Sequence, residues 1–243
     1  MNKPKSVFNW SGGKDSALAL YHVLKEGQLE IDSLLTTVNS AYRRISMHGV
    51  REEFLYEQGK AIGLPIRVVE LPEMPSMLEY NAIMDRVNND LKKNEVFYSI
   101  SGDIFLKNLR KYKEKRLKAA GLEGHFPLWG KNTNRLVREF IDVGFKAVVV
   151  CANGEMLGKD FIGRVIDEDF LKDLPTNVDP CGENGEFHSF VFDGPIFRQP
   201  IKYKLGEKVF KEYKAPKSAD DNCSTSVPSK KRLGFHFIDI IQD

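Results

Sequence analysis

Short apolar stretches alternate with helix-like segments through the first two thirds of this chain, and this alternation constrains the fold more than any other feature. Five stretches are predicted strands: Ser6–Asn9, Leu34–Val38, Ile66–Leu71, Val96–Ser101 and Phe145–Ala152. Amphipathic helical periodicity lies between them, over Lys14–Lys25, Arg51–Ile62, Met77–Leu91 and Asn132–Val143. Near-continuous apolar strands that alternate with helices indicate a parallel sheet covered on both faces. We therefore predict an α/β fold with a five-stranded parallel sheet and helices on both sides.

The character of the chain changes after about residue 153, where glycine and acidic residues become frequent. The strands predicted there are shorter and alternate polar with apolar residues: Phe187–Phe192, Ile201–Leu205, Lys208–Tyr213 and Leu233–Ile241. A polar segment, residues 214–231, predicts a mobile loop. We expect two domains, residues 1–125 and a smaller mixed α+β domain at 126–243 that binds substrate.

Composition excludes several classes of protein. The 243 residues carry a formal charge of +2, which gives no reason to expect a nucleic acid or a membrane surface as partner. The three cysteines are far apart, form no CxxC pair and do not suggest a disulfide framework or a zinc site. No apolar run approaches the length of a membrane span, so we expect a cytoplasmic protein. A homo-oligomer is compatible with the sequence.

The stretch Ser11-Gly12-Gly13-Lys14-Asp15-Ser16 joins the first predicted strand to the first predicted helix. Free backbone N–H groups and the helix dipole make such a junction an anion site. The two glycines allow the backbone to approach a phosphate closely, and the lysine adds a cation. The serine hydroxyls can donate hydrogen bonds, and Asp15 can hold Mg²⁺ or cap the turn. Neither GxxxxGK[ST] nor GxGxxG is present.

This stretch resembles the PP-loop of ATP pyrophosphatases, whose fold is the adenine nucleotide alpha hydrolase type. The resemblance implies that ATP binds at Ser11 to Ser16 and is cleaved between its α- and β-phosphates, with AMP transferred to a carboxylate or amide oxygen. Lys14 and a metal ion held by Asp15 would stabilise the charge that develops on phosphate.

A second polar stretch, Ser101-Gly102-Asp103-Ile104, ends the fourth predicted strand. Open α/β sheets bind ligands beyond the carboxyl ends of their strands, so Gly102 is a candidate nucleotide contact. Asp103 is a candidate catalytic residue and Mg²⁺ ligand, with helix capping as the alternative.

A third stretch, DPCGENGEFHSFVFDGPIF from Asp179 to Phe197, holds Glu183 and Glu186 around an Asn-Gly turn that leads into an alternating strand. Phenylalanines anchor the strand, which would hold the acidic turn in a fixed place. This arrangement suits a site for ammonia, a metal or a cationic substrate, and a solvated acidic hairpin is the alternative.

Together with FPLW (Phe126–Trp129) and LGKDFIGRVID (Leu157–Asp167), these three stretches closely resemble the diphthine–ammonia ligase family, from about Lys5 to Phe197. The resemblance implies ATP-dependent amidation of a carboxylate by ammonia, with diphthine, a modified histidine of elongation factor 2, as the acceptor. It places Gly102 and Asp103 at the nucleotide cleft and the two glutamates in the second domain. Glu183 or Glu186 is then the candidate base that takes a proton from ammonium.

The chain also departs from the family pattern. It reads Gly182-Glu183-Asn184-Gly185-Glu186-Phe187-His188-Ser189, with His188 in place of an acidic residue, and FLKNLRKYKEKRL follows Ile104. These departures resemble a bacterial-type branch, and bacteria are not expected to make diphthamide. The acceptor therefore stays open between diphthine and a small-molecule carboxylate such as a corrinoid precursor.

Several further residues are candidates for a role in binding or catalysis. Met47 and His48 follow the second predicted strand and are candidates to line the adenine pocket. The basic run Lys107–Lys118 is expected to be a solvated helix face, with binding of an acidic or phosphate-bearing macromolecule as the alternative. A tRNA-thiolating PP-loop enzyme would need closely placed cysteines, for which Cys151 and Cys181 are the candidates. A non-enzymatic adenine-nucleotide sensor is the remaining alternative.

Overall fold

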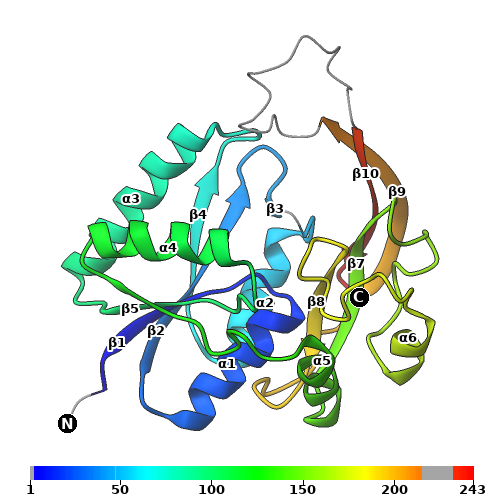
Figure 1. Ribbon diagram of the computed structural model, residues 1–243, viewed down its shortest axis with the longest axis horizontal. Coiled ribbons are helices and arrows are strands. Elements are labelled where there is room, and N and C mark those ends of the chain that lie inside the picture. The colour runs from blue at the N-terminus through cyan, green and yellow to red at the C-terminus, as the bar shows by residue number, and fades with distance from the viewer. Residues whose placement is uncertain (1–2, 47, 215–231) are drawn as a thin grey trace.

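A computed structural model describes residues 3–46, 48–214 and 232–243 (Figure 1). Two of our sequence predictions fall on residues outside these ranges. They are the nucleotide contact of Met47 and the loop at 214–231, of which the structure describes only the first residue, Lys214, as the end of a strand. Among the helices that the structure describes, none has the length and apolar character needed to cross a bilayer.

The first sheet contains five parallel strands, the number that we predicted. Their order across the sheet is β4-β2-β1-β5-β6, and the short strand β3 pairs antiparallel with the end of β2. The strands are β1 (Lys5–Asn9), β2 (Glu30–Asn39), β3 (Arg44–Ile45), β4 (Ile66–Leu71), β5 (Tyr98–Ile100) and β6 (Glu123–His125). The direction of winding reverses between β1 and β5, so the carboxyl ends of these two strands flank the crevice where such sheets bind ligands.

Helices cover both faces of this sheet, as predicted. Neighbouring residues of β1 point to opposite faces, and each belongs to a different hydrophobic core. Phe8 packs with residues of α1 (Lys14–Glu26) and α2 (Glu52–Ile62), whereas Val7 packs with residues of α3 (Met77–Lys93) and α4 (Lys107–Ala119). The side chain of Ser76 and the carboxylate of Glu79 form a capping box that fixes the start of α3.

The second sheet is antiparallel, with strand order β8-β7-β10-β9. Its strands are β7 (Lys146–Asn153), β8 (Phe187–Asp193), β9 (Lys204–Lys214) and β10 (Arg232–Ile241), and α5 (Thr133–Asp142) and α6 (Glu168–Asp173) lie in the same part of the chain. The placement of Phe145–Ala152 in the parallel sheet was therefore wrong, because this segment forms β7. The prediction of separate strands at Ile201–Leu205 and Lys208–Tyr213 was also wrong, since Lys204–Lys214 is one strand.

The second sheet packs on the side of the first sheet that α1 and α2 cover (Figure 1). Buried residues of both sheets form one continuous hydrophobic core. Phe54 of α2 meets Phe190 of β8 edge to face, with ring centroids 5.3 Å apart. This packing places β8 directly beside the turn between β1 and α1.

Candidate active site

The turn between β1 and α1 has the geometry of an anion site. Gly13 is the N-cap of α1, and Gly12 adopts a φ of +77°, which favours glycine. The Ser16 hydroxyl donates to the Gly13 carbonyl at 2.8 Å and lies 3.1 Å from the Ser11 hydroxyl oxygen. The Gly13 N–H meets the Ser11 Oγ at 3.3 Å, a long contact. The structure thus brings Ser11 to Ser16 together at the start of a helix, with hydroxyls and N–H groups around one turn.

Lys14 is buried, with 4% of its surface exposed, and its ammonium group points into the protein. The Nζ donates to Asp15 Oδ2 at 2.8 Å and to the carbonyl oxygen of Cys181, and it lies 5.2 Å from the ring centroid of Phe187. Burial alone would lower the pKa of Lys14, but the carboxylate of Asp15 and other negative groups raise it above its usual value. The lysine therefore keeps its positive charge inside the site.

Asp15 follows Lys14 in the first turn of α1. Burial raises the pKa of its carboxyl group, against the opposing effect of Lys14. Asp15 is partly exposed, so its carboxylate remains within reach of solvent and of a ligand at the helix start.

Gly102, beyond the end of β5, packs directly on the turn. A Cβ atom at Gly102 would lie 2.9 Å from the carbonyl oxygen of Asp15 and 3.1 Å from the nitrogen of Ser16. Only glycine permits this close approach of two backbone segments. The structure therefore joins the first and second predicted stretches into one site at the crevice between β1 and β5.

Asp103 has a strong partner of its own. Both carboxylate oxygens accept hydrogen bonds from Lys113 Nζ of α4, at 2.8 and 2.7 Å. An ion at Asp103 would have to share this carboxylate with Lys113. The predicted capping role is not seen at the start of α4, whose N-cap is Leu106 and carries no side-chain cap.

Glu183 brings the third predicted stretch into the same site. Its Oε1 accepts a hydrogen bond from the backbone N–H of Ile104 at 2.8 Å. Burial raises the pKa of Glu183 to about 7, and the charges of Asp15 and Asp103 act in the same direction against the opposing effects of the Ile104 N–H and of Lys14. A carboxyl group that titrates near neutral pH can exchange protons during a reaction.

Glu186 is in a different environment, although it lies only three residues further along. Its side chain is buried, and its two oxygens accept hydrogen bonds from the Asp179 N–H at 3.1 Å and from the backbone N–H and the side-chain amide of Asn184 at 2.9 and 3.0 Å. These bonds hold the turn 179–186 in shape. The geometry therefore favours Glu183 over Glu186 as a group that reacts.

His48 lies at the rim of the predicted phosphate-loop turn, Ser11 to Ser16 between β1 and α1, where its Nε2 would be 3.2 Å from a Cβ placed on Gly13. Its ring stacks at a tilt on His188, with centroids 4.5 Å apart. Burial lowers the pKa of His48 to about 4 and that of His188 well below its usual range, and Lys14 adds to both effects. Both imidazoles are therefore neutral at physiological pH.

Two residues that sequence reasoning missed also contact the turn. Ser189 of β8 accepts a hydrogen bond on its Oγ from the Lys14 N–H at 3.1 Å. Gln58 of α2 hydrogen-bonds to the carbonyl of Gly12. Ser189 falls within the third quoted stretch, which is a weak signal, whereas Gln58 lies in an ordinary helical pattern and carries none.

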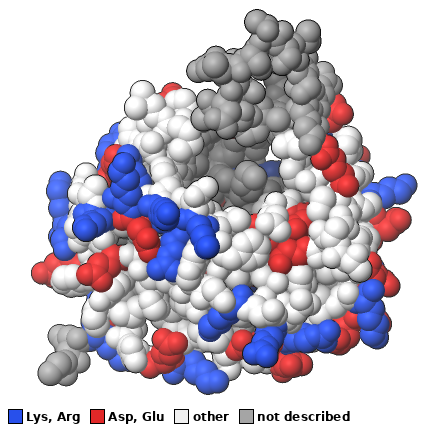
Figure 2. Space-filling view, in the orientation of Figure 1, with Lys and Arg blue, Asp and Glu red and all other residues white. Residues whose placement is uncertain are grey.

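The basic run forms α4, which contacts the site through the ion pair of Lys113 with Asp103. Figure 2 shows Lys and Arg side chains gathered over this helix. Arg110, Lys113 and Arg116 are paired with acidic groups, while four lysines of the helix are exposed: Lys107, Lys111, Lys115 and Lys118. The prediction of a solvated helix face is confirmed for these four.

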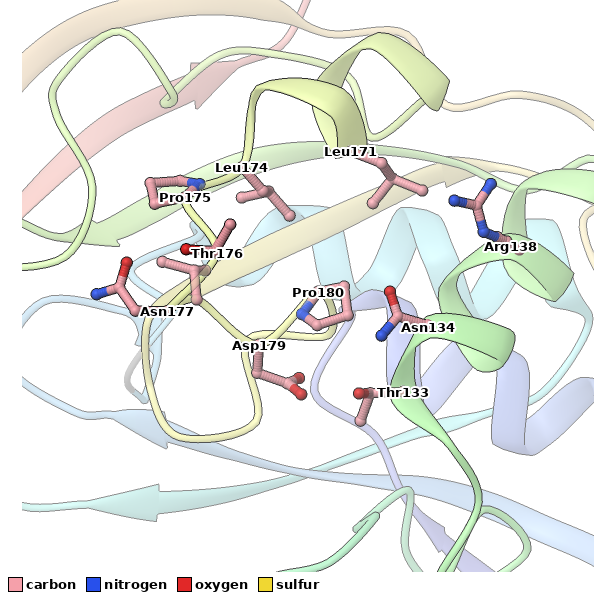
Figure 3. A pocket seen from close by; sticks show the side chains of 11 residues that line it. Thr133, Asn134, Arg138, Leu171, Leu174, Pro175, Thr176, Asn177, Asp179 and Pro180 are labelled. Atoms are coloured by element: carbon pink, nitrogen blue, oxygen red, sulfur yellow. The ribbon is translucent and has the colours of Figure 1, made fainter.

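A hollow of about 420 Å³ lies beside the turn 179–186, between α5 and the segment that follows α6 (Figure 3). Asp179 is part of both the hollow and the turn. It lines the hollow, and its carboxylate accepts hydrogen bonds from the N–H groups of Cys181 and Glu183 of the turn at 2.8 and 3.4 Å. The other lining residues are Thr133, Asn134, Arg138, Leu171, Leu174, Pro175, Thr176, Asn177, Val178 and Pro180.

Among the described residues, the structure shows neither an exposed thiol nor a metal site built from protein ligands alone. Cys151 and Cys181 are buried free thiols; burial raises the pKa of Cys151 to about 12 and also raises that of Cys181. Over the ranges that the structure describes, no three His, Cys, Asp or Glu side chains are grouped so that they could hold a metal ion.

Comparison with known families identifies the chain. Residues 4–124 match the family described as the diphthamide synthase N-terminal domain, and residues 132–218 match the diphthamide synthase C-terminal domain. The chain belongs to the diphthamide synthase family. The family resemblance that the three stretches suggested is thereby confirmed.

Curated relatives agree with this assignment. The chain is 25% identical over 230 residues to diphthine–ammonia ligase of Rattus norvegicus and 25% identical over 223 residues to that of Homo sapiens, with 82% of each chain covered in both cases. Among solved structures, the U34-tRNA thiolase NcsA from Methanococcus maripaludis with its [4Fe-4S] cluster is similar, with a TM-score of 0.37, 16% identity and coverage of 59% of this chain and 58% of that one. That TM-score is too low to support an argument about function.

This diphthamide synthase family member is thus an ATP-dependent ligase. The family membership confirms the predicted enzyme class and the predicted use of ATP.

Proposed function

We propose that this enzyme forms an amide from a carboxylate and ammonia, with ATP cleaved to AMP and pyrophosphate. The observation that carries the proposal is the contact of Glu183 with the backbone of Ile104, because it places a carboxyl group that titrates near neutral pH at the same crevice as the phosphate-loop turn. A site for activation by phosphate transfer and a base for ammonia are the two parts that such a reaction requires.

In the first step, an oxygen of the acceptor carboxylate attacks the α-phosphate of ATP, and pyrophosphate leaves. We propose that the N–H groups and hydroxyls of Ser11 to Ser16 bind the phosphates, and that Lys14 turns its charge from the Cys181 carbonyl to the phosphate oxygens. Gly102 and His48 would border the nucleotide. Carboxylate ligands together with substrate phosphates are the usual donor set for Mg²⁺, so Asp15 and Asp103 are suited to hold this ion, which would offset phosphate charge.

In the second step, ammonia attacks the acyl carbon and AMP leaves. We propose that Glu183 accepts the proton of the bound ammonium ion and so makes the nitrogen nucleophilic. Glu186 is assigned a positioning role, since its hydrogen bonds hold the turn that carries Glu183. Residues 1–125 would then act on ATP, and residues 126–243 would supply the base and bind the acceptor.

We propose diphthine on elongation factor 2 as the acceptor, because the curated relatives are named diphthine–ammonia ligases. A small-molecule carboxylate remains the second candidate, favoured by the hollow of about 420 Å³ beside the turn that carries Glu183. The buried, protonated thiols do not favour tRNA thiolation.

The products of the reaction test the proposal. Incubation with ATP, an ammonium salt and the acceptor should give AMP and pyrophosphate in equal amounts, resolved by ion-exchange chromatography. Asp15→Asn should reduce this yield because it removes a carboxylate from the phosphate site. Formation of ADP and phosphate would rule out activation by adenylation.

A further inference from the structure

Gln58, in the middle of α2, is fully buried, and its amide group hydrogen-bonds to the phosphate-loop turn, to the residue just before the turn and to β8. Its Oε1 accepts a hydrogen bond from Trp10 Nε1 at 2.8 Å, which fixes the orientation of the amide. Its Nε2 donates to the carbonyl of Gly12 at 3.0 Å and to the carbonyl of Val191 at 2.8 Å. One side chain therefore joins α2, the phosphate-loop turn and β8.

The carbonyl of Gly12 is held from two sides, because the Val191 N–H of β8 also donates to it, at 2.9 Å. In a planar trans peptide the C=O and the following N–H point in opposite directions. Holding the Gly12 carbonyl against Gln58 and β8 therefore turns the Gly13 N–H away from them. That N–H is at the start of α1, and among the described residues its partner is Ser11 Oγ, at the long distance of 3.3 Å.

The same amide explains why glycine is required at position 12. A Cβ there would lie 2.8 Å from Gln58 Oε1, and the residue already has a positive φ. The turn is thus shaped around Gln58.

We propose that Gln58 is a positioning residue for nucleotide binding: its amide, with the Val191 N–H, orients the Gly12–Gly13 peptide so that the Gly13 N–H faces the phosphates of ATP. The inference rests on the proposed binding of phosphate at Ser11 to Ser16. Through Val191 of β8, the second sheet then helps to shape the phosphate-loop turn.

Binding of ATP and of adenosine, measured by isothermal titration calorimetry, tests this role. Gln58→Leu should raise the Kd for ATP about tenfold, the size expected when one or two oriented hydrogen bonds are lost. Adenosine has no phosphate, so its Kd should stay the same. A purely structural defect would weaken both ligands together.

Phe54→Leu is the matched control, since Phe54 lies on the same helix and packs on Phe190 of β8, and its side chain has no group that could hydrogen-bond to the Gly12 carbonyl. It should lower the melting temperature and leave the ratio of the two Kd values unchanged. If Gln58→Leu does not fold, Gln58→Glu keeps the side-chain size and the acceptor for Trp10 while it removes the amide donors, and the same selective loss is expected.

An unchanged ATP-to-adenosine ratio in a folded Gln58 variant would overturn this inference. If that variant still formed AMP and pyrophosphate at the wild-type rate, the proposed function would stand without it. If the wild-type protein bound ATP no more tightly than adenosine, the result would contradict both the proposed function and the role given to Gln58.

Discussion

Lys14→Met is expected to lower kcat about 100- to 1,000-fold, the range observed when one group that stabilises transition-state charge is removed. Lys14 is the buried cation of the phosphate-loop turn and keeps its charge beside Asp15. Methionine fills similar space without that charge. Release of pyrophosphate, followed in a coupled assay at saturating ATP, measures the effect.

Lys172→Met provides the control, because Lys172 is an exposed lysine whose partner, Asp169, lies far from the turn in the sequence. This variant should keep the wild-type rate. A folded Lys14→Met enzyme with kcat close to that of the control would contradict the role given to Lys14.

Glu183→Gln is expected to lower kcat by about 100- to 10,000-fold, the usual contribution of a positioned general base. Glu183 can accept a proton only when it is ionised. Because its pKa is raised to about 7, the rate of the wild-type enzyme should fall about tenfold for each pH unit below 7. Glutamine does not titrate, so this decline should vanish from the pH profile of the variant.

The melting temperature of Glu183→Gln distinguishes loss of the general base from unfolding of the enzyme. The pKa of Glu183 rises on folding from 4.5 to about 7, so the folded state binds the proton more tightly than the unfolded state does. The ionised group therefore opposes folding above pH 7, and this penalty is absent below pH 4.5. Glu183→Gln should melt no lower than wild type at pH 8, as measured by differential scanning calorimetry.

Glu186→Gln is the paired control for this prediction. It disturbs the hydrogen bonds inside the turn and should lower the melting temperature, while the decline in rate below pH 7 stays in place. Persistence of that decline in Glu183→Gln would show that another group is the base.

The sequence was sufficient to predict four of the five parallel strands and the turn between β1 and α1, because these depend on local patterns. Glycines at a strand-to-helix junction, followed by a lysine at the helix start, are typical of a turn that binds phosphate. The placement of β7 failed for a physical reason. β7 is a central strand covered on both faces, so its near-continuous apolar pattern reports burial and carries no information about strand direction.

The finer parts of the site depend on tertiary contacts. β6 has only three residues, too few for a pattern. Glu183 and Glu186 look equivalent in sequence, and they differ because one meets the backbone of Ile104 while the other holds its own turn. Gln58 is 46 residues from Gly12, and only the packing of α2 brings them together.

A crystal structure with α,β-methylene-ATP tests the central claim most directly, because this analogue cannot be cleaved between its α- and β-phosphates. The β- and γ-phosphates should lie against the backbone of Gly12 to Ser16, with Lys14 Nζ moved from the Cys181 carbonyl to a phosphate oxygen. A triphosphate bound elsewhere, with Lys14 still on that carbonyl, would contradict the account.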